Sequence, residues 1–281
     1  MTTTTTDHAT PTAPAPDAAV LPAADAPPPQ QAVRTALRAI GVIAHRDLLR
    51  QLRRPGILVS QAVQILFFVL VYAVGFDSMI PSAGGLPFSA YVFPGIIAIQ
   101  VVSIGMASGQ TYAWDREYGV LRELLVAPVP RVCLPLGKVV AGAGLVTAQS
   151  AAMLAFAPLT GIPLTAARFA GALACYALTA VVFSVLGLTL ATVITRVQTL
   201  QASVQLAMFP MLFLSGSVFS AADAPGWLGR LMHLNPMTYA VDATRQILLG
   251  APGLHALSTD LAALGALLAA ALVTLRLRSG R

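Results

Sequence analysis

Residues 115–128 of the chain read DREYGVLRELLVAP, a charged stretch between two long apolar ones. It contains Glu117 and Glu123, the only two glutamates of the sequence. Residues 78–114 before it and residues 139–167 after it contain no Asp, Glu, Lys or Arg. About 20 apolar residues cross the hydrocarbon core of a bilayer as a helix. Residues 114–127 are therefore predicted to form a short helix that faces water between two membrane spans.

The composition is that of an integral membrane protein. Of the 281 residues, 57% are hydrophobic and 10% are charged, whereas about a quarter of the residues in a soluble domain are charged. We predict an all-α integral membrane fold with six transmembrane helices. The windows without charge place these spans near residues 57–77, 90–113, 134–158, 169–194, 199–219 and 256–275.

The basic residues indicate an orientation, because cytoplasmic loops of membrane proteins carry an excess of Lys and Arg. Of the 17 basic residues, only Arg168, Arg230 and Arg245 fall on one predicted side. We therefore expect a multi-pass protein of the plasma membrane with both termini in the cytoplasm. The same rule explains the net charge of +6 without a nucleic-acid partner, since no basic groove with interleaved aromatic residues is present.

Cysteine and histidine give no sign of a redox or metal centre. Cys133 and Cys175 fall in opposite halves of the predicted bilayer, so both are expected to be free thiols. The four histidines are scattered without the spacing of metal ligands, and we assign no metal site and no catalytic residue.

Three segments lie outside the predicted spans. Residues 1–30, rich in Thr, Ala and Pro, are expected to be a disordered cytoplasmic tail. Residues 31–54 alternate apolar residues at helical spacing with arginines, which predicts an amphipathic helix at the inner membrane interface. Residues 220–255 are predicted to be an extracellular hairpin of two short helices, split at Asn235-Pro236 and ended by Gly250. A surface loop with helical turns is the alternative.

Polar and sulfur-containing side chains within the predicted spans suggest a path for a solute. The candidates are Gln100, Ser103 and Met106 on the second span and Gln201, Gln205, Met208 and Phe209 on the fifth. Such a mixture suits a large, mostly apolar molecule with a few polar groups. Glutamine also joins transmembrane helices by hydrogen bonds, so a purely structural role is the alternative. Small residues on the third span, among them Gly137, Gly142 and Gly144, suit close packing within the chain or between two chains.

Two motifs resemble the permease subunits of type-2 ATP-binding cassette (ABC) transporters, in particular the daunorubicin-resistance-like permeases. The first is Trp114-Asp115-Arg116-Glu117-Tyr118-Gly119 with Leu121, Ala127-Pro128 and Gly137-Lys138. The second is Asn235-Pro236-Met237-Thr238-Tyr239-Ala240-Val241-Asp242 with Arg245 and Gly250. The resemblance covers about residues 31–281. Val120 stands where the family commonly has Thr after the glycine.

The resemblance implies that residues 31–281 form a six-span transmembrane domain that pairs with a second permease chain, as a homodimer, and with ATPase subunits. Residues 114–127 would then be the coupling helix that contacts the ATPase, through Asp115, Arg116, Glu117, Tyr118, Gly119, Leu121, Arg122 and Glu123. No opposite charges stand four residues apart in this helix, so its charges are expected to be free for a partner. A solvated turn at the interface is the alternative.

The expected function is the export of a hydrophobic drug, antibiotic or similar small molecule. Gly137-Lys138 is followed by Val139 and no G-x-x-x-x-G-K-[ST] loop is present, so ATP and Mg²⁺ are expected on the partner subunit and no cofactor on this chain. A charged solute would need countercharges in the spans, and the predicted spans are interpreted as uncharged, so the cargo is expected to be neutral or amphipathic. Export of a lipid-linked polysaccharide is the alternative, and a lipid-modifying membrane enzyme is a less favoured class. In the outer hairpin the candidate residues are Asn235, Pro236, Tyr239, Asp242 and Arg245. Arg245 is expected to stabilise the hairpin by pairing with Asp242 or with a carbonyl at a helix end, and contact with the substrate is the alternative.

Overall fold

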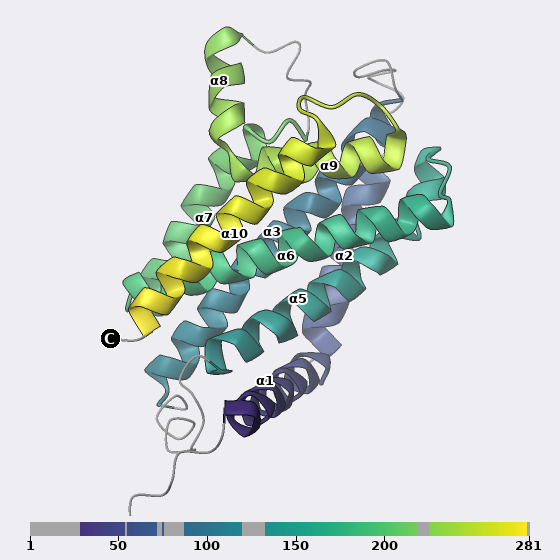
Figure 1. The fold of residues 1–281 in the computed structure, drawn as a ribbon. Coiled ribbons are helices and arrows are strands. Elements are labelled where there is room, and N and C mark those ends of the chain that lie inside the picture. The colour runs from purple at the N-terminus through teal and green to yellow at the C-terminus, as the bar shows by residue number, and fades with distance from the viewer. Residues whose placement is uncertain are drawn as a thin grey trace, which may run out of the picture.

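The protein is a bundle of helices, seen here in a computed structural model that describes residues 29–53, 55–71, 75, 87–119, 133–217 and 225–279. Within these ranges every regular element is helical, which confirms the all-α prediction. The α-helices are α1 (Pro29–Leu52), α2 (Pro55–Leu70), α3 (Phe88–Glu117), α5 (Cys133–Leu154), α6 (Ala166–Val193), α7 (Val197–Phe213), α8 (Gly226–Leu234), α9 (Pro236–Leu249) and α10 (Leu257–Ser279) (Figure 1). Residues 1–28 of the predicted tail lie outside the described residues.

A helix occupies each of the six predicted spans, and these helices are α2, α3, α5, α6, α7 and α10. Three of them, α3, α6 and α10, are long and apolar enough to cross a membrane. Helix α2 has 16 residues and α7 has 17, which is at the lower limit for a span. The apolar helices agree with an integral membrane protein, while the six-span topology stays a prediction.

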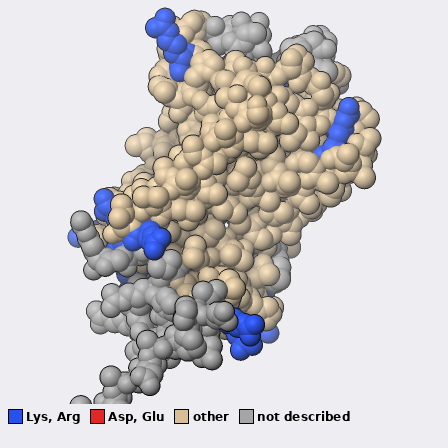
Figure 2. Space-filling view, in the orientation of Figure 1, with Lys and Arg blue, Asp and Glu red and all other residues tan. Residues whose placement is uncertain are grey.

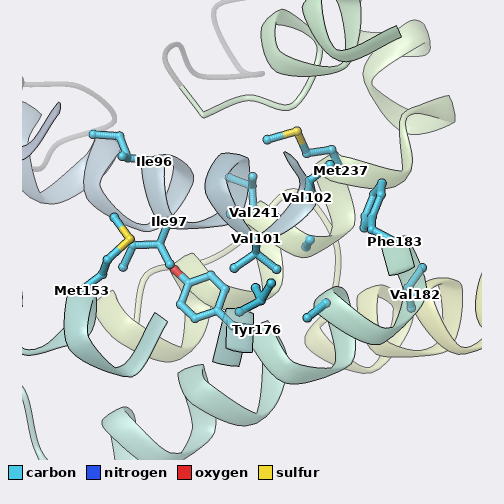
Figure 3. Packing of buried hydrophobic residues seen from close by; sticks show 14 of the residues in the cluster. Ile96, Ile97, Val101, Val102, Met153, Tyr176, Val182, Phe183, Met237 and Val241 are labelled. Carbon is cyan, nitrogen blue, oxygen red and sulfur yellow. The ribbon is translucent and has the colours of Figure 1, made fainter. Parts of the chain in front are cut away.

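The centre of the bundle is the contact between α3 and α6. Ile97 and Val101 of α3 lie against Tyr176 of α6, and Met237 and Val241 of α9 complete this side of the core (Figure 3). All five of these side chains are buried.

Glycine allows the two central helices to approach closely. A Cβ atom added to Gly109 of α3 would collide with the backbone of Gly187 of α6, and one added to Gly187 would collide with the backbone of Met106. Dispersion contacts grow as backbones come together, and this is how helices associate where lipid offers no hydrophobic gain. The α3–α6 pair therefore forms a tightly packed axis of the fold.

The small residues of α5 contact different neighbours. Gly137 packs against Ile43 of α1, and Gly142 packs against Ser108 of α3, whereas Gly144 faces open space. Close packing within the chain thus accounts for Gly137 and Gly142. Cys133 and Cys175 are buried free thiols, as expected.

The bundle has two dissimilar ends. Helix α1 lies at one end, and the hairpin of α8 and α9 lies at the other (Figure 1). On the face shown in Figure 2, Lys and Arg side chains gather toward the margins and a broad uncharged surface lies between them. Such a distribution is typical of a protein whose middle faces lipid.

Helices α2 and α7 expose apolar side chains. On α7, Leu206, Phe209 and Phe213 are more than half exposed. On α2, the large apolar side chains that are exposed include Val59, Val63, Leu66, Phe67 and Leu70. The described part of the chain leaves these two faces uncovered, so lipid or another protein must cover them in the membrane.

Candidate functional site

The charged motif begins as the last turn of α3 rather than as a separate helix. Helix α3 continues through Asp115 and Arg116 to Glu117. Gly119 has a φ of +78°, a conformation that other residues rarely adopt, and the chain leaves the helical path there. Residues 114–117 therefore continue the helix of the second predicted span, and the coupling role of residues 114–127 stays a prediction. The rest of the segment, including Leu121, Arg122 and Glu123, lies outside the described residues.

Lys138 of α5 lies at the centre of a buried ion network. Its Nζ is 2.6 Å from Asp115 Oδ2 on α3 and 3.1 Å from Asp47 Oδ2 on α1. All three residues are at most 4% exposed. At the edge of the network, Arg50 lies 3.4 Å from Asp115 Oδ1 and Arg46 lies 3.1 Å from Asp47 Oδ1. Two carboxylates and three cations thus join α1, α3 and α5.

Arg116 joins α3 to the end of α6. Its guanidinium donates hydrogen bonds to the carbonyl oxygens of Ala191, Ile194 and Thr195, at 2.9, 3.0 and 2.8 Å. The last carbonyls of a helix have no partner within the helix and carry partial negative charge. Arg116 therefore caps α6 with charge-assisted bonds.

The expectation that every charge of the motif is free for a partner is wrong for Asp115 and Arg116. Both side chains are engaged within the chain, because residues distant in sequence supply Lys138 and the end of α6. Glu117 and Tyr118 are exposed, and the Tyr118 side chain is 79% exposed. Trp114 at the start of the motif is exposed as well, so Trp114, Glu117 and Tyr118 remain available to a partner among the described residues.

A polar pocket of about 450 Å³ lies beside the ion network. Three predicted path residues line it, namely Gln100 and Ser103 of α3 and Gln205 of α7. Its remaining lining residues are Asp47, Gln64, Ile104, Ala107, Ser108, Thr111, Lys138, Ala141 and Gly142. The hydroxyls of Ser108 and Ser184 lie 3.3 Å apart at this wall. Amide, hydroxyl and ionic groups from α1, α2, α3, α5 and α7 thus converge on one cavity.

Two expectations about the path need correction. The premise that the spans hold no charge is wrong, since Lys138 of the third predicted span lines the pocket, where it pairs with Asp47 of α1. The full set of path residues does not come together either. Met106 is buried in the core, whereas Gln201 and Phe209 are exposed on α7 and Met208 is partly buried, and none of these four lines the pocket. Residues three or four apart on a helix share a face only approximately, and α3 presents Met106 to α6.

The predicted hairpin is present, with helices α8 and α9 in place of a loop. Asn235 caps α9, since its Oδ1 accepts a hydrogen bond from the Met237 amide, and Pro236 occupies the first turn. Gly250 ends α9 with a φ of +67°. Asn235 Nδ2 also donates to the Met211 carbonyl at 2.8 Å, and Thr238 Oγ1 donates to the Leu214 carbonyl at 2.9 Å. The second motif thus fastens α9 to the end of α7.

Arg245 bonds to a carbonyl, the second of its two expected partners. Its Nη2 donates to the Gly216 carbonyl at 2.8 Å, just beyond α7, and its guanidinium lies 3.9 Å from the centre of the Tyr91 ring. Asp242 instead accepts hydrogen bonds from the amides of Leu254 and His255. Tyr239 donates its hydroxyl to the His233 carbonyl at 2.6 Å. The hairpin residues are thus tied to α3, to α7 and to the loop before α10.

Two groupings were missed from the sequence. Lys138 meets Asp47 across 91 positions, and Asp242, His255 and Asp260 come together between α9 and α10. The sequence held a signal for the pairing of Lys138 with Asp47, because Lys138 is the only lysine of the chain and Asp47 is the only acidic residue in α1. The sequence held no such signal for Asp242, His255 and Asp260, since their spacing along the chain is not that of a known metal-ligand motif.

Comparison with known proteins agrees with these features. Residues 38–249 match the family model described as ABC-2 type transporter. The chain belongs to this family. The matched range includes the ion network, the pocket and the hairpin helices α8 and α9.

Three relatives of the ABC-2 chain illustrate its range of similarity. It is 31% identical to the probable multidrug ABC transporter permease YbhR of Escherichia coli K12 over 169 residues, which are 58% of this chain and 45% of YbhR. It is 26% identical to nodulation protein J of Neorhizobium galegae, over 70% of this chain and 76% of that protein. It is 25% identical to the inner membrane transport permease YadH of Escherichia coli K12, over 69% of this chain and 75% of YadH. The chain thus spans less than half the length of YbhR.

Proposed function

We propose that this ABC-2 chain is the transmembrane subunit of an ATP-driven exporter that moves hydrophobic small molecules out of the cell. The observation that carries the proposal is the polar pocket within an otherwise apolar bundle of this family. A probable multidrug permease among its relatives supports the choice of cargo. ATP hydrolysis is assigned to a separate subunit, because the sequence has no phosphate-binding loop.

The pocket favours a neutral or amphipathic solute. Gln100, Gln205 and Ser103 offer donors and acceptors, while Ile104 and Ala107 offer apolar contact. Lys138 and Asp47 neutralise each other, so their charges do not demand a charged cargo. A solute with a few polar groups would satisfy the amides without breaking the ion pair.

A second copy of the chain would complete the path. Gln64 of α2 and Gln205 of α7 line the pocket, and the same two helices expose apolar faces bearing Val63, Phe67, Leu206 and Phe209. Pairing of these faces in a homodimer would bury the apolar side chains and enclose the glutamines between two chains. The same faces would otherwise be covered by lipid.

The end of α3 is suited to contact an ATPase subunit and to transmit the movement of that subunit to the other helices. Exposed Glu117 and Tyr118 would bind the subunit, and residues 120–127 would extend that contact. The buried ion network joins α1, α3 and α5, and the hydrogen bonds of Arg116 add α6. These contacts would make the four helices move together, so a displacement at Glu117 would reach the pocket walls.

Export of a lipid-linked polysaccharide is the alternative within the same machinery. The observation that favours this alternative is that the relatives of the chain include nodulation protein J as well as a probable multidrug permease. A sugar chain is expected to slide along aromatic side chains, and only 7% of the residues are aromatic. None of the residues that line the pocket is aromatic.

A transport assay in membrane vesicles tests the proposal. The chain is co-expressed with candidate ATPase subunits, and ATP-dependent uptake of a panel of hydrophobic dyes is measured in inside-out vesicles. Gln205→Leu and Gln100→Leu should change the relative uptake of the dyes several-fold while co-purification with the ATPase is retained. Val273→Ala, at an exposed apolar position on α10 outside the proposed homodimer faces of α2 and α7, serves as the control. Equal dye profiles for all three variants would reject the pocket as the path, and ATP-dependent export of labelled polysaccharide without dye uptake would favour the alternative.

A further inference from the structure

We propose that Asp242, His255 and Asp260 bind a divalent transition-metal ion of the Zn²⁺ class between α9 and α10. One ligand comes from α9, one from the loop after it and one from the first turn of α10. Their three ligand atoms lie within 4.8 Å of one another. The site goes beyond the proposed transport function, and its test does not depend on transport.

The spacing of the ligand atoms suits a small ion. His255 Nδ1 lies 3.3 Å from Asp260 Oδ1 and 3.8 Å from Asp242 Oδ2. Zn²⁺ binds nitrogen and oxygen at about 2.0–2.2 Å in a tetrahedron, which separates neighbouring ligand atoms by roughly 3.3–3.5 Å. A small inward movement of Asp242 would complete three corners of that tetrahedron.

Two buried ligand atoms lack a hydrogen bond. Asp260 is fully buried and Asp242 is 5% exposed. Asp260 Oδ1 and His255 Nδ1 face each other, yet neither has a hydrogen-bond partner among the described residues. Buried carboxylates are costly unless a cation balances them. The neighbouring cation on α9, Arg245, is directed to the Gly216 carbonyl and the Tyr91 ring instead.

The surroundings of His255 fix its ring in the orientation of a ligand. Its Nε2 is 2.8 Å from His233 Nδ1, and its ring stacks on Tyr239 with 5.1 Å between the ring centres. If Nε2 carries the proton and donates it to His233, the lone pair of Nδ1 points at the two carboxylates. Metal-bound histidines almost always donate their other ring N–H to a neighbouring acceptor, and here His233 Nδ1 would take that place.

The carboxylates are also held in place by neighbours. Asp242 accepts the amides of Leu254 and His255 at 3.0 and 2.9 Å. Gln246 Nε2 lies 3.0 Å from Asp260 Oδ2, which leaves Oδ1 of that residue for the ion. Gly253 passes so close that a Cβ there would collide with Gln246 and Asp242. An ion at this position would clamp the hairpin to the last predicted span.

An imidazole ligand selects the class of metal. Nitrogen ligands suit Zn²⁺ and its transition-metal neighbours, whereas Ca²⁺ and Mg²⁺ prefer sites made of oxygen ligands. The set of one imidazole and two carboxylates leaves a fourth position for water. His255 is 16% exposed in its side chain, so the ion can enter from the solvent side of the loop.

Metal binding by the purified protein tests the site. The full chain, isolated in detergent with a tag that contains no histidine, is stripped with EDTA, and ZnCl₂ is titrated by calorimetry with elemental analysis after desalting. One Zn²⁺ per chain is expected, with a higher melting temperature. Asp260→Asn and His255→Gln should each weaken Zn²⁺ binding at least tenfold and abolish the rise in melting temperature. His45→Gln, an exposed histidine on α1, should behave as the parent.

The outcomes separate the site from its alternatives. Because Asp260→Asn removes a buried group, size-exclusion profiles and circular dichroism establish that each variant is folded, and His255→Gln gives a second reading at a partly exposed position. Equal Zn²⁺ binding by the parent and both folded variants would overturn the proposal. So would the absence of Zn²⁺ binding by the parent.

Discussion

Lys138 Nζ and Asp115 Oδ2 lie 2.6 Å apart, with both side chains at most 3% exposed. Asp47 shares the same ammonium group at 3.1 Å. Breaking a buried ion pair by removing one partner is far more harmful than the modest net value of the pair suggests, because the remaining charge stays buried. The only lysine of the chain therefore supports two carboxylates on two different helices.

We predict that Lys138→Met destabilises the protein strongly. Two buried carboxylates would lose their central cation, and the expected loss is on the order of 3–5 kcal/mol. The measurement is thermal unfolding in detergent, followed by fluorescence-detected size exclusion. Arg46→Ala is the matched control, because Arg46 pairs with Asp47 from a side chain that is 43% exposed, and such pairs contribute about 0–1 kcal/mol. Equal melting temperatures for the two variants would contradict a central role for Lys138.

A second prediction concerns the glycines between helices. Gly109→Ala should destabilise the protein by about 1–3 kcal/mol or more, since its new methyl group would meet the backbone of Gly187 and backbone cannot move aside as a side chain can. Gly144→Ala adds the same methyl group to α5 where nothing lies within 4 Å. That control should be neutral or stabilising by up to about 1 kcal/mol, because Ala is the better helix former. A melting curve for each variant decides between these outcomes.

The sequence predicted the helices better than the contacts among them. Helix boundaries follow from local signals, such as Asn235-Pro236 at the start of α9 and Gly250 at its end. The joining of Asp47, Asp115 and Lys138 depends instead on how α1, α3 and α5 pack, and hydrophobic periodicity does not specify that. Asp115 and Arg116 were misjudged for this reason. Their partners lie 23 or more positions away along the chain.

At the candidate site, too, some predicted residues come together and others do not. Gln100, Ser103 and Gln205 were predicted to share a path and do line one pocket. Met106 and Phe209 were placed with them by helical spacing, yet the rotation of each helix sends Met106 into the core and Phe209 to the surface. Helix rotation is set by packing against neighbours, which a single sequence does not show.

Coupling gives a third prediction, at the exposed end of α3. Glu117→Ala should leave folding unchanged, because the side chain is exposed, yet it should reduce ATP-dependent transport several-fold by weakening contact with the ATPase subunit. Arg122→Glu, in the same motif, should act likewise. Arg53→Ala, an exposed basic residue just after α1, is the control. Full transport and normal co-purification of the ATPase with both motif variants would show that coupling lies elsewhere.

The last prediction separates structure from recognition at Arg245. This side chain bonds to the Gly216 carbonyl at 2.8 Å and lies 3.9 Å from the centre of the Tyr91 ring, so it holds α9 against α3 and the end of α7. A hydrogen bond from a charged group contributes about 1.5–3 kcal/mol, and a desolvated cation–π contact adds about 2. Arg245→Ala should therefore lower the melting temperature and reduce export of every compound by the same factor. Arg245→Lys should recover part of the stability, since the ammonium keeps the charge but not the planar fork. Arg230→Ala, an exposed position on α8, is the control. An Arg245→Ala protein that melted like the parent and exported an altered selection of compounds would assign Arg245 to substrate recognition, because a purely structural clamp has no means of distinguishing one cargo from another.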